Sequence, residues 1–227
     1  MAYSTARPPR ARACRRAGVL AALYAALGVA NSTSAGKRFS AGEWATKPLL
    51  MPVLAAFLLA AAGDRRAVRL PAAGIVLGGL GDTALLASGD WFLPGMGSFA
   101  AGHACYIAEF VKDGSARQVR VPVAAGYGAA WAVLMALLWR RLGSLRVPVA
   151  AYSLLLISMA TLASGRNQAA AAGGALFVAS DALIACDLAG IDVVPGQDAA
   201  VMPTYIAGQF LLAFGWLLPQ RRTESKG

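Results

Sequence analysis

The sequence predicts an all-α fold, a polytopic bundle of eight transmembrane helices, and three observations support this prediction. Hydrophobic residues make up 58% of the 227 positions and charged residues only 14%, whereas soluble domains carry about 25% charged residues. The mean hydropathy is +0.56. The apolar stretches recur at lengths of roughly 20 residues, which is what a helix needs to cross about 30 Å of hydrocarbon. This composition excludes an ordinary soluble domain.

Eight apolar stretches have a length close to that of a membrane span. They occupy residues 17–35, 45–62, 70–87, 91–111, 119–139, 147–163, 168–190 and 199–218. Barrel strands are excluded because they would be about half as long and would alternate apolar and polar residues. The connections are short, so neighbouring helices are antiparallel. We therefore expect one transmembrane domain over residues 17–219, between a basic amino-terminal tail, 1–16, and a short basic carboxy-terminal tail, 220–227.

The first stretch has a second interpretation. Basic residues from Arg7 to Arg16 precede the apolar run, and Ser34 and Ala35 follow it, an order that is also typical of a secretory signal peptide. Removal of such a peptide would leave seven spans. The run is long for a signal, which favours a transmembrane helix.

The basic residues favour an orientation with both termini in the cytoplasm. In this orientation fifteen basic residues are cytoplasmic: Arg7, Arg10, Arg12, Arg15, Arg16, Arg65, Arg66, Arg69, Lys112, Arg117, Arg120, Arg166, Arg221, Arg222 and Lys226. Five lie on the outer side: Lys37, Arg38, Arg140, Arg141 and Arg146. The net charge of +10 comes from these loops and tails, so nucleic-acid binding is not expected. We expect an integral protein of a bacterial-type plasma membrane.

Two segments separated by the same interval resemble each other. Gly81-Asp82-Thr83-Ala84-Leu85 resembles Ser180-Asp181-Ala182-Leu183-Ile184, and Tyr106-Ile107-Ala108-Glu109-Phe110 resembles Tyr205-Ile206-Ala207-Gly208-Gln209-Phe210. Asp82 and Asp181 are 99 residues apart, and so are Tyr106 and Tyr205. A duplicated unit of four helices would keep its orientation and give a parallel repeat about an axis along the membrane normal. Chance matches are common in a chain rich in alanine and glycine, so the duplication and coincidence both stay open.

Five charged residues lie inside the predicted spans, where a charged side chain costs roughly 2.5–3.5 kcal/mol. They are Lys47, Asp82, Glu109, Asp181 and Asp187. Glu109 and Asp187 lie close to helix ends, and we interpret them as interfacial charges. Asp82 and Asp181 are too deep to reach headgroup water, so we expect them to face a polar cavity.

Other polar residues lie at similar depths. Counted from the outer helix ends, the depths are about 3 Å for Lys47, about 8 Å for Asp82 and Tyr152, about 9 Å for Tyr205, about 14 Å for Asp181, about 15 Å for Gln209 and about 18 Å for His103. Helical spacing also places Gly74, Gly78 and Asp82 on one face, and Phe99, His103, Tyr106 and Phe110 on another. These residues predict one polar pocket that opens toward one membrane face.

Several classes of site find no support in the sequence. There is no Gly-x-Ser-x-Gly nucleophile motif and no phosphate-binding glycine loop followed by lysine and serine or threonine. His103 is the only histidine, and Cys14, Cys105 and Cys186 lack the paired spacing of metal ligands. We therefore expect no metal and no cofactor.

Taken in order, the polar motifs resemble the YhhN family of membrane proteins, which includes the lysoplasmalogenases. The matching elements are Lys47-Pro48, Gly81-Asp82-x-x-Leu85, Phe99-x-x-Gly102-His103-x-x-Tyr106, Tyr152, Gly174-Ala175-Leu176-Phe177-x-x-Ser180-Asp181 and Tyr205-x-x-x-Gln209. The resemblance covers nearly the whole chain after the first predicted helix. It implies an eight-helix fold and hydrolysis of the vinyl ether bond of lysoplasmalogens.

This chemistry suits the pocket that the residues predict. Our hypothesis is that Asp82 and Asp181 are the catalytic acid and base, in an order that the sequence does not reveal. Lys47 would bind the phosphate of the lysophospholipid, with the long tail among the helices. The residues expected to orient the carboxylates or the glycerol hydroxyl are His103, Tyr106, Tyr152, Tyr205 and Gln209.

Two other functions stay open at this point. Intramembrane carboxylates and paired four-helix units also occur in small-molecule and proton-coupled transporters. An inert scaffold is the third interpretation, although it would leave two buried aspartates without a role. The sequence favours the enzyme, mainly through the family resemblance, and does not predict the oligomeric state.

Overall fold

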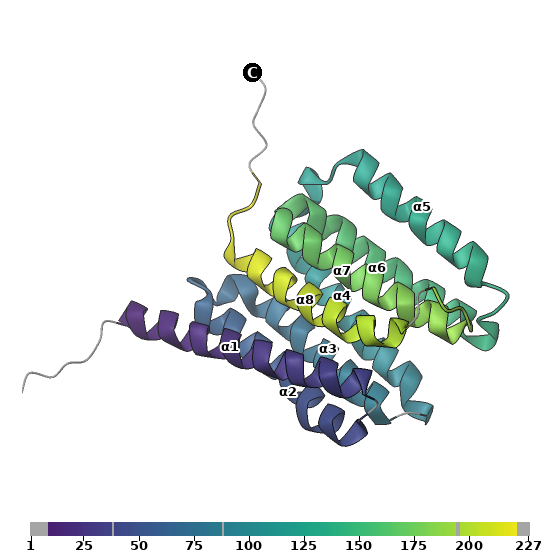
Figure 1. Ribbon diagram of the computed structural model, residues 1–227. Coiled ribbons are helices and arrows are strands. Elements are labelled where there is room, and N and C mark those ends of the chain that lie inside the picture. Colours follow the sequence, from purple (N-terminus) through teal and green to yellow (C-terminus); the bar gives the residue numbers. More distant parts are fainter. Residues whose placement is uncertain (1–8, 38, 88, 194–195, 222–227) are drawn as a thin grey trace, which may run out of the picture.

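A computed structural model of the protein describes residues 9–37, 39–87, 89–193 and 196–221. Within these residues the chain forms eight α-helices and no strand. The helices are α1 (Pro9–Gly36), α2 (Ser40–Ala61), α3 (Arg69–Ala87), α4 (Phe92–Lys112), α5 (Val121–Leu138), α6 (Arg146–Arg166), α7 (Gln168–Leu188) and α8 (Gln197–Leu217). They run side by side as a bundle in which α1 and α5 lie at opposite edges (Figure 1). The predicted all-α fold is confirmed.

The observed helices lie close to the predicted spans. The largest difference is at α1, which begins at Pro9 rather than at 17, so that half of the predicted basic tail is helical. Helix α2 begins at Ser40 rather than at 45. Among the basic residues used for the orientation, Arg7, Arg38, Arg222 and Lys226 lie outside the described residues.

Seven helices of the described chain are long and apolar enough to cross a membrane, so the protein is an integral membrane protein. The helix that falls short is α4, which was predicted as a span. Its 21 residues have the necessary length, but they include His103 and Glu109. Both side chains are buried against other helices rather than exposed to lipid, which is how polar residues inside a membrane protein are usually accommodated.

The first helix packs on the bundle. Helix α1 lies against α2 and α8. The Tyr24 hydroxyl donates a hydrogen bond of 2.9 Å to the carbonyl oxygen of Ile206 in α8. The Asn31 amide donates one of 2.8 Å to the hydroxyl of Thr46 in α2. Inside apolar surroundings such bonds replace water as the partner of each polar group, and here they join α1 to two neighbours.

Glycines allow two helical hairpins to pack closely. A Cβ atom on Gly74 in α3 would lie 2.9 Å from the carbonyl oxygen of Gly102 in α4, and one on Gly173 in α7 would lie 2.8 Å from that of Gly208 in α8. Because lipid tails are as apolar as leucine, close packing of small residues drives helix association in a membrane. The α3–α4 and α7–α8 hairpins are therefore rigid units that hold whatever side chains they carry.

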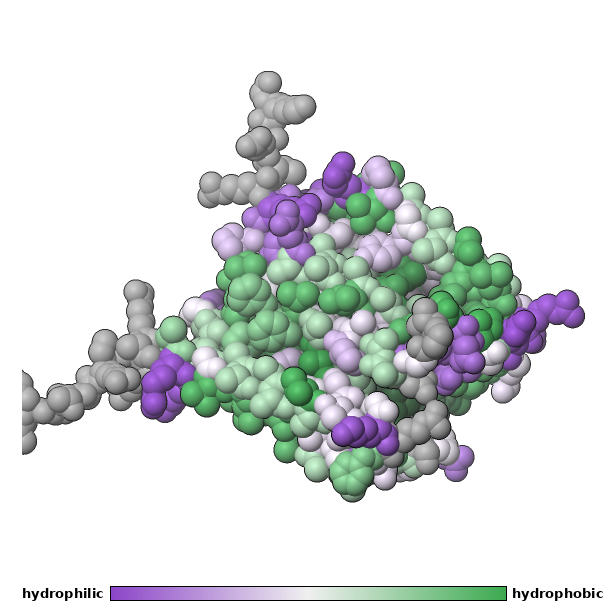
Figure 2. Space-filling model, in the orientation of Figure 1, coloured by the Kyte–Doolittle hydropathy of each residue, from purple (hydrophilic) through white to green (hydrophobic). Residues whose placement is uncertain are grey.

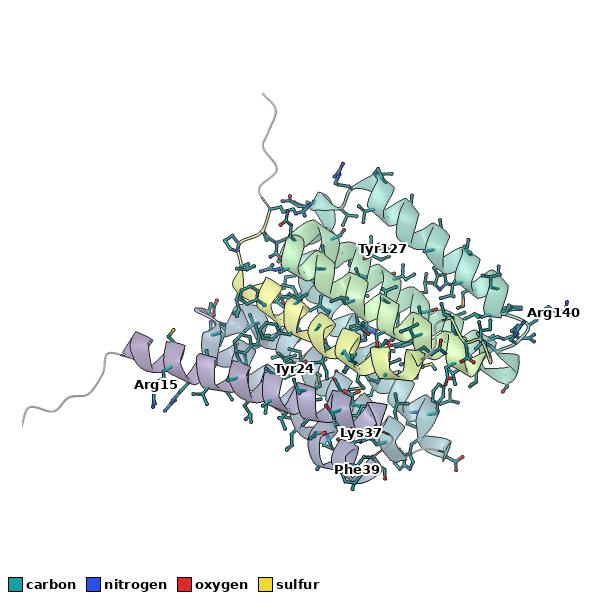
Figure 3. All side chains as sticks on the ribbon, viewed as in Figure 1. Arg15, Tyr24, Lys37, Phe39, Tyr127 and Arg140 are labelled. Atoms are coloured by element: carbon teal, nitrogen blue, oxygen red, sulfur yellow. The ribbon has the colours of Figure 1, made fainter. Side chains whose placement is uncertain are left out.

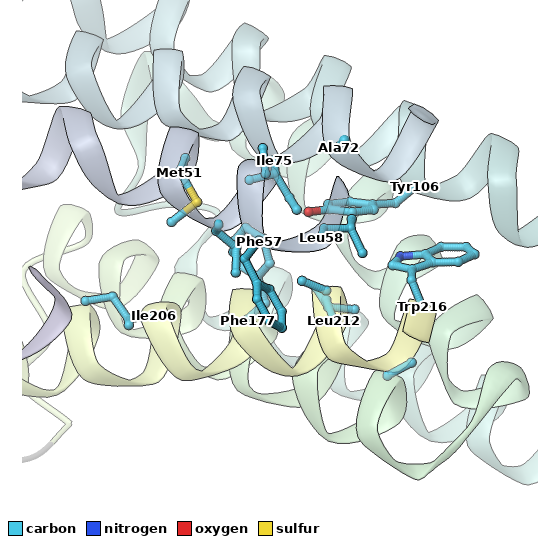
Figure 4. Packing of buried hydrophobic residues seen from close by; sticks show 14 of the residues in the cluster. Met51, Phe57, Leu58, Ala72, Ile75, Tyr106, Phe177, Ile206, Leu212 and Trp216 are labelled. Carbon is cyan, nitrogen blue, oxygen red and sulfur yellow. The ribbon is translucent and has the colours of Figure 1, made fainter. Parts of the chain in front are cut away.

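The hydrophobic core lies between these two hairpins and α2. Figure 4 shows Ile75, Leu58 and Tyr106 on one side of it and Phe177 and Leu212 on the other, pointing toward one another. All five side chains are almost completely buried. Dense packing of this kind has few voids, so the residues next to it are held in defined positions.

The outer surface of the bundle matches a bilayer. The face seen in Figure 2 is largely apolar, and its hydrophilic residues gather toward the ends. Arg15 and Lys37 lie at opposite ends of α1, and Arg140 lies beyond the end of α5 (Figure 3). Trp44, Trp91 and Trp139 are exposed near the same end of the bundle as Lys37: at the starts of α2 and α4 and the end of α5. Tryptophan is enriched at membrane–water interfaces, so these three tryptophans mark one of the two interfaces.

The opposite end is closed by the Arg166 cluster, which comprises Asp113, Arg166, Asn167 and Gln220. Arg166 forms an ion pair with Asp113 and donates to the carbonyl oxygens of Gly215 and Trp216, at 3.1 and 3.2 Å. These carbonyls belong to the last turn of α8, and carbonyl groups in the last turn of a helix have no hydrogen-bond donor within that helix. Arg166 was predicted only as a cytoplasmic loop charge; the residue is 8% exposed, and its side chain ties α6 to α8.

The predicted duplication stays a prediction. The third helix of each half carries one of the two aspartates, and each half contains one of the glycine-packed hairpins. The two halves differ elsewhere, because α1 packs extensively on α2 whereas α5 packs mainly on α6 and more sparsely.

Candidate functional site

Six helices surround a cavity of about 100 Å³, in the half of the bundle that carries the three exposed tryptophans. It lies among the first halves of α2, α4, α6 and α8 and the second halves of α3 and α7. Five of the eight predicted site residues line it: Lys47, Asp82, Tyr152, Asp181 and Tyr205. The two aspartates, 99 positions apart in the sequence, thus share one cavity that faces one end of the bundle.

Asp82 lies on α3 and is 3% exposed. Its Oδ2 atom accepts a hydrogen bond of 2.8 Å from the hydroxyl of Tyr205 on α8. That hydroxyl accepts a longer one, 3.4 Å, from Nε2 of Gln209. The Oε1 atom of Gln209 in turn accepts a bond of 2.9 Å from the hydroxyl of Tyr106 on α4. A continuous chain of three donors therefore ends on the Asp82 carboxylate.

Glycine in α3 makes room for this chain. A Cβ atom on Gly78 would lie 3.3 Å from Nε2 of Gln209 and 3.5 Å from the Tyr205 hydroxyl. Gly78 is one turn before Asp82 and shares its face. The spacing of Gly74, Gly78 and Asp82 thus places a bare backbone where α4 and α8 approach, with the carboxylate at the open end.

Asp181 lies on α7 and is half-buried. Its Oδ2 atom accepts a hydrogen bond from the hydroxyl of Tyr152 on α6. Nε2 of His103 lies 3.2 Å from the same hydroxyl. Because the hydroxyl proton is directed at Asp181, Nε2 must be the donor in this contact. Nδ1 of His103 is then buried without a hydrogen-bond partner among the described residues.

Helix α4 supports both carboxylates from behind. His103 and Tyr106 are three residues apart on one face of α4, and both side chains are 1% exposed. The predicted stripe of Phe99, His103, Tyr106 and Phe110 is entirely buried. His103, Tyr106 and Gln209 do not line the cavity. His103 contacts Tyr152 and Gln209 contacts Tyr205, whereas Tyr106 reaches Tyr205 only through Gln209. These contacts are compatible with the predicted role of orienting the carboxylates, which stays a prediction.

Lys47 lies about two turns inside α2 rather than at its end, because the helix begins at Ser40. Its side chain is half-buried and lines the cavity together with both aspartates. The depth of about 3 Å that the sequence predicts is thus too small: seven residues correspond to about 10 Å.

Other lining residues were not singled out from the sequence. Ser180 is fully buried beside Asp181, and its hydroxyl donates a hydrogen bond of 3.0 Å to the carbonyl oxygen of Val201 in α8. The sequence signal for Ser180 is its place directly before Asp181 in the family motif. The remaining lining is mostly apolar and includes Met96, Val201 and Met202. Such residues resemble ordinary core in a sequence, so no pattern distinguishes them.

The arrangement brings two acidic groups to one apolar cavity. Each has one tyrosine hydroxyl as its side-chain donor among the described residues, and a carboxylate has about four lone-pair sites. Both therefore retain acceptor sites for water or a ligand. In the described part of the chain, no three histidine, cysteine, aspartate or glutamate side chains form a cluster suited to a metal ion.

Comparison with known proteins places the chain in a family. The model of the YhhN family matches residues 42–216, most of the chain and every residue of the cavity. No curated protein and no solved structure matches it. The match includes both aspartates, both tyrosines that donate to them, and Lys47. The protein belongs to the YhhN family.

Proposed function

We propose that the protein is an integral membrane hydrolase that cleaves the vinyl ether bond of a lysoplasmalogen-type lysophospholipid. The products are a fatty aldehyde and a glycerophospho-alcohol. The observation that carries the proposal is the pair Asp82 and Asp181, which line one cavity within the membrane. The association of the YhhN family with lysoplasmalogenase activity supports the same reaction.

The reaction needs an acid and a base. One carboxyl group, in its protonated form, transfers its proton to the β-carbon of the vinyl ether, which leaves an oxocarbenium ion at the carbon bonded to oxygen. Water attacks that carbon and gives its proton to the other, ionised carboxylate. The resulting hemiacetal loses its hydroxyl proton and its bond to the glycerol oxygen breaks, while that oxygen takes up a proton. General acid–base catalysis by such a pair typically contributes about 10²–10⁴-fold.

The surrounding side chains suit these steps. Tyr205 and Tyr152 each donate to one carboxylate, which fixes the orientation of the remaining oxygen atoms. The cavity volume of about 100 Å³ is enough for roughly three water molecules at ~30 Å³ each. Water for the hydrolysis therefore fits between the aspartates. Lys47, on the wall of the same cavity, is suited to bind the phosphate of the substrate.

The membrane orientation extends the proposal. The cavity lies toward the end of the bundle that carries the three exposed tryptophans and Lys37. If both termini are cytoplasmic, as the basic residues favour, this end faces the outer side of the membrane. A lysophospholipid would then enter from the outer leaflet.

Purified protein incubated with a lysoplasmalogen provides the test. We expect release of fatty aldehyde in amounts equal to the glycerophospho-alcohol, and no aldehyde from the matching lysolipid whose ether is saturated, because it has no double bond to protonate. Absence of aldehyde from the vinyl ether would contradict the proposal. Substrate-coupled proton flux into liposomes without cleavage would instead identify a transporter.

A further inference from the structure

A second cavity adjoins the first. It lies among α5, α6 and α7 and has a volume of about 540 Å³, within the range of about 300–1,000 Å³ that is usual for ligand pockets. Its walls are apolar except for a few residues, and they include Ala130, Trp131, Leu134, Ser153, Leu156 and Val178. The first cavity, which Asp82 and Asp181 line, has a volume of about 100 Å³ and is too small for a lipid tail.

The two cavities have a common wall. Val149, Tyr152, Asp181 and Ala185 line both. Tyr152 and Asp181 are hydrogen-bonded to each other, so the apolar cavity begins at one of the two carboxylates. A molecule that reacts beside Asp181 in the first cavity, with its polar end toward Lys47, would extend into the second cavity.

Helix α5 forms the outer wall and is held loosely. It packs mainly on α6, and many of its residues are exposed, among them Val133 at 60% and Leu137 at 65%. Two described side-chain hydrogen bonds cross the cavity, both at Ser153 on α6: Nε1 of Trp131 donates to its hydroxyl at 2.9 Å, and that hydroxyl donates to the sulfur of Met135 at 4.0 Å. The cavity is thus bounded by a helix at the edge of the bundle (Figure 1), next to the lipid.

We propose that this cavity binds the long alkenyl chain of the substrate, which enters sideways from the bilayer between α5 and α6–α7. The proposal rests on the proposed function, and it adds a tail site and an entry route. The headgroup lies toward Lys47, the vinyl ether lies between Asp82 and Asp181, and the chain passes Tyr152 into the space beneath Trp131. A single chain is the occupant because the cavity adjoins the reacting groups along one wall only.

The bundle contains a groove that serves as an internal comparison. It lies between α1 and α8, is lined by Tyr24, Gly28 and Phe210 among others, and has a volume of about 470 Å³. It is of similar size and also lies beside the lipid, but neither aspartate lines it. Ordinary bilayer lipid would occupy both spaces, whereas a substrate chain would occupy only the one under α5.

Photo-crosslinking tests the proposal without turnover. The probe is a long-chain saturated-ether lysophosphocholine with a diazirine near the end of its chain, used with the full-length protein in liposomes. We expect labelled peptides from α5, α6 and α7, and protection by excess lysoplasmalogen but not by diacyl lipid. Equal labelling of the α1–α8 groove, or labelling that lysoplasmalogen does not reduce, would overturn the proposal.

Substitutions within α5 sharpen the test. Ala130→Phe places a larger side chain in the cavity, which competes with the lipid chain for space, so labelling of α6 and α7 should fall about tenfold. Ala132→Phe is the matched control, since Ala132 is exposed on the same helix and does not line the cavity. Unchanged labelling in Ala130→Phe would contradict the tail site. If the wild type is labelled in this way but releases no aldehyde, the hydrolase proposal is contradicted and the tail site is supported. If it releases aldehyde but is not labelled in this way, the tail site is contradicted and the hydrolase proposal is supported.

Discussion

The cavity lined by Asp82 and Asp181 and the Arg166 cluster lie toward opposite ends of the bundle. They differ in whether their charged groups are paired with each other. In the Arg166 cluster the guanidinium pairs with Asp113, donates to two carbonyl oxygens of α8 and lies 4.2 Å above the Trp216 ring. Asn167 accepts from the backbone of Ala170 and donates to Gly215. Opposite charges meet, and each donor has an acceptor.

The cavity that Asp82 and Asp181 line instead brings two groups of the same charge together, with Lys47 on its wall. Asp82 and Asp181 share an apolar space, and each is supported by a tyrosine rather than neutralised by an arginine. Buried polar groups are normally fully hydrogen-bonded, so unused acceptors beside a cavity are available to a ligand. The comparison indicates that paired charge closes the fold at one end, whereas carboxylate oxygens stay open to a ligand at the other.

The largest effect is expected when a carboxylate in the cavity is removed. Asp82→Asn or Asp181→Asn should each lower aldehyde release by about 10²–10⁴-fold, because the amide can neither donate the acid proton nor take up a proton from water. Asp187→Asn is the matched control, since Asp187 is exposed near the end of α7. Size-exclusion profiles in detergent check that the variants fold. Full activity in both cavity variants would disprove the catalytic assignment.

Removal of Arg166 should affect stability and not chemistry. Arg166→Met leaves the half-buried carboxylate of Asp113 without its partner. Breaking a fully buried pair costs about 3–5 kcal/mol, and we expect a smaller loss here because Asp113 still contacts solvent. We expect a lower unfolding temperature in detergent and unchanged turnover per folded molecule. Arg117→Met, an exposed arginine near Asp113, is the control. If Arg166→Met reduced turnover but left the unfolding temperature unchanged, the contrast between the two clusters would fail.

Loss of a tyrosine hydroxyl should have an intermediate effect. Tyr205→Phe or Tyr152→Phe removes the donor of one carboxylate, and hydrogen bonds to charged groups contribute about 1.5–3 kcal/mol. Turnover should fall by about ten- to a hundredfold, with little change in the unfolding temperature. Steady-state kinetics with a short-chain lysoplasmalogen measures this loss. A large drop in stability with normal turnover would show that these tyrosines resemble the Arg166 cluster.

The smallest effect is expected at Lys47. Because its side chain is half-buried beside water, its attraction for a phosphate is worth about 1 kcal/mol. Lys47→Met should therefore raise KM for the phospholipid about fivefold and leave kcat nearly unchanged. Lys37→Met tests an exposed lysine at the same end of the bundle. An equal rise in KM in both variants would reduce Lys47 to a general surface charge.

Much of the fold was predictable because a bilayer imposes simple rules. A span must be about 20 apolar residues long and must satisfy its own backbone hydrogen bonds, so runs of apolar residues reveal the helices directly. Helix α4 was recognised by length, although His103 and Glu109 reduce its apolar character. The same rules identified Asp82 and Asp181 as candidates, since a charge far from water needs a polar site.

The sequence by itself determined the helices and the residues that merit attention. Only the tertiary structure decided which of these residues meet. Tyr205 donates to Asp82 across 123 positions, and Arg166 donates to Gly215 across 49. The hydropathy of a helix tells which residues are inside the membrane but hardly constrains which neighbour each one faces. That choice depends on close contacts such as Gly74 against Gly102, which form only when whole helices pack together.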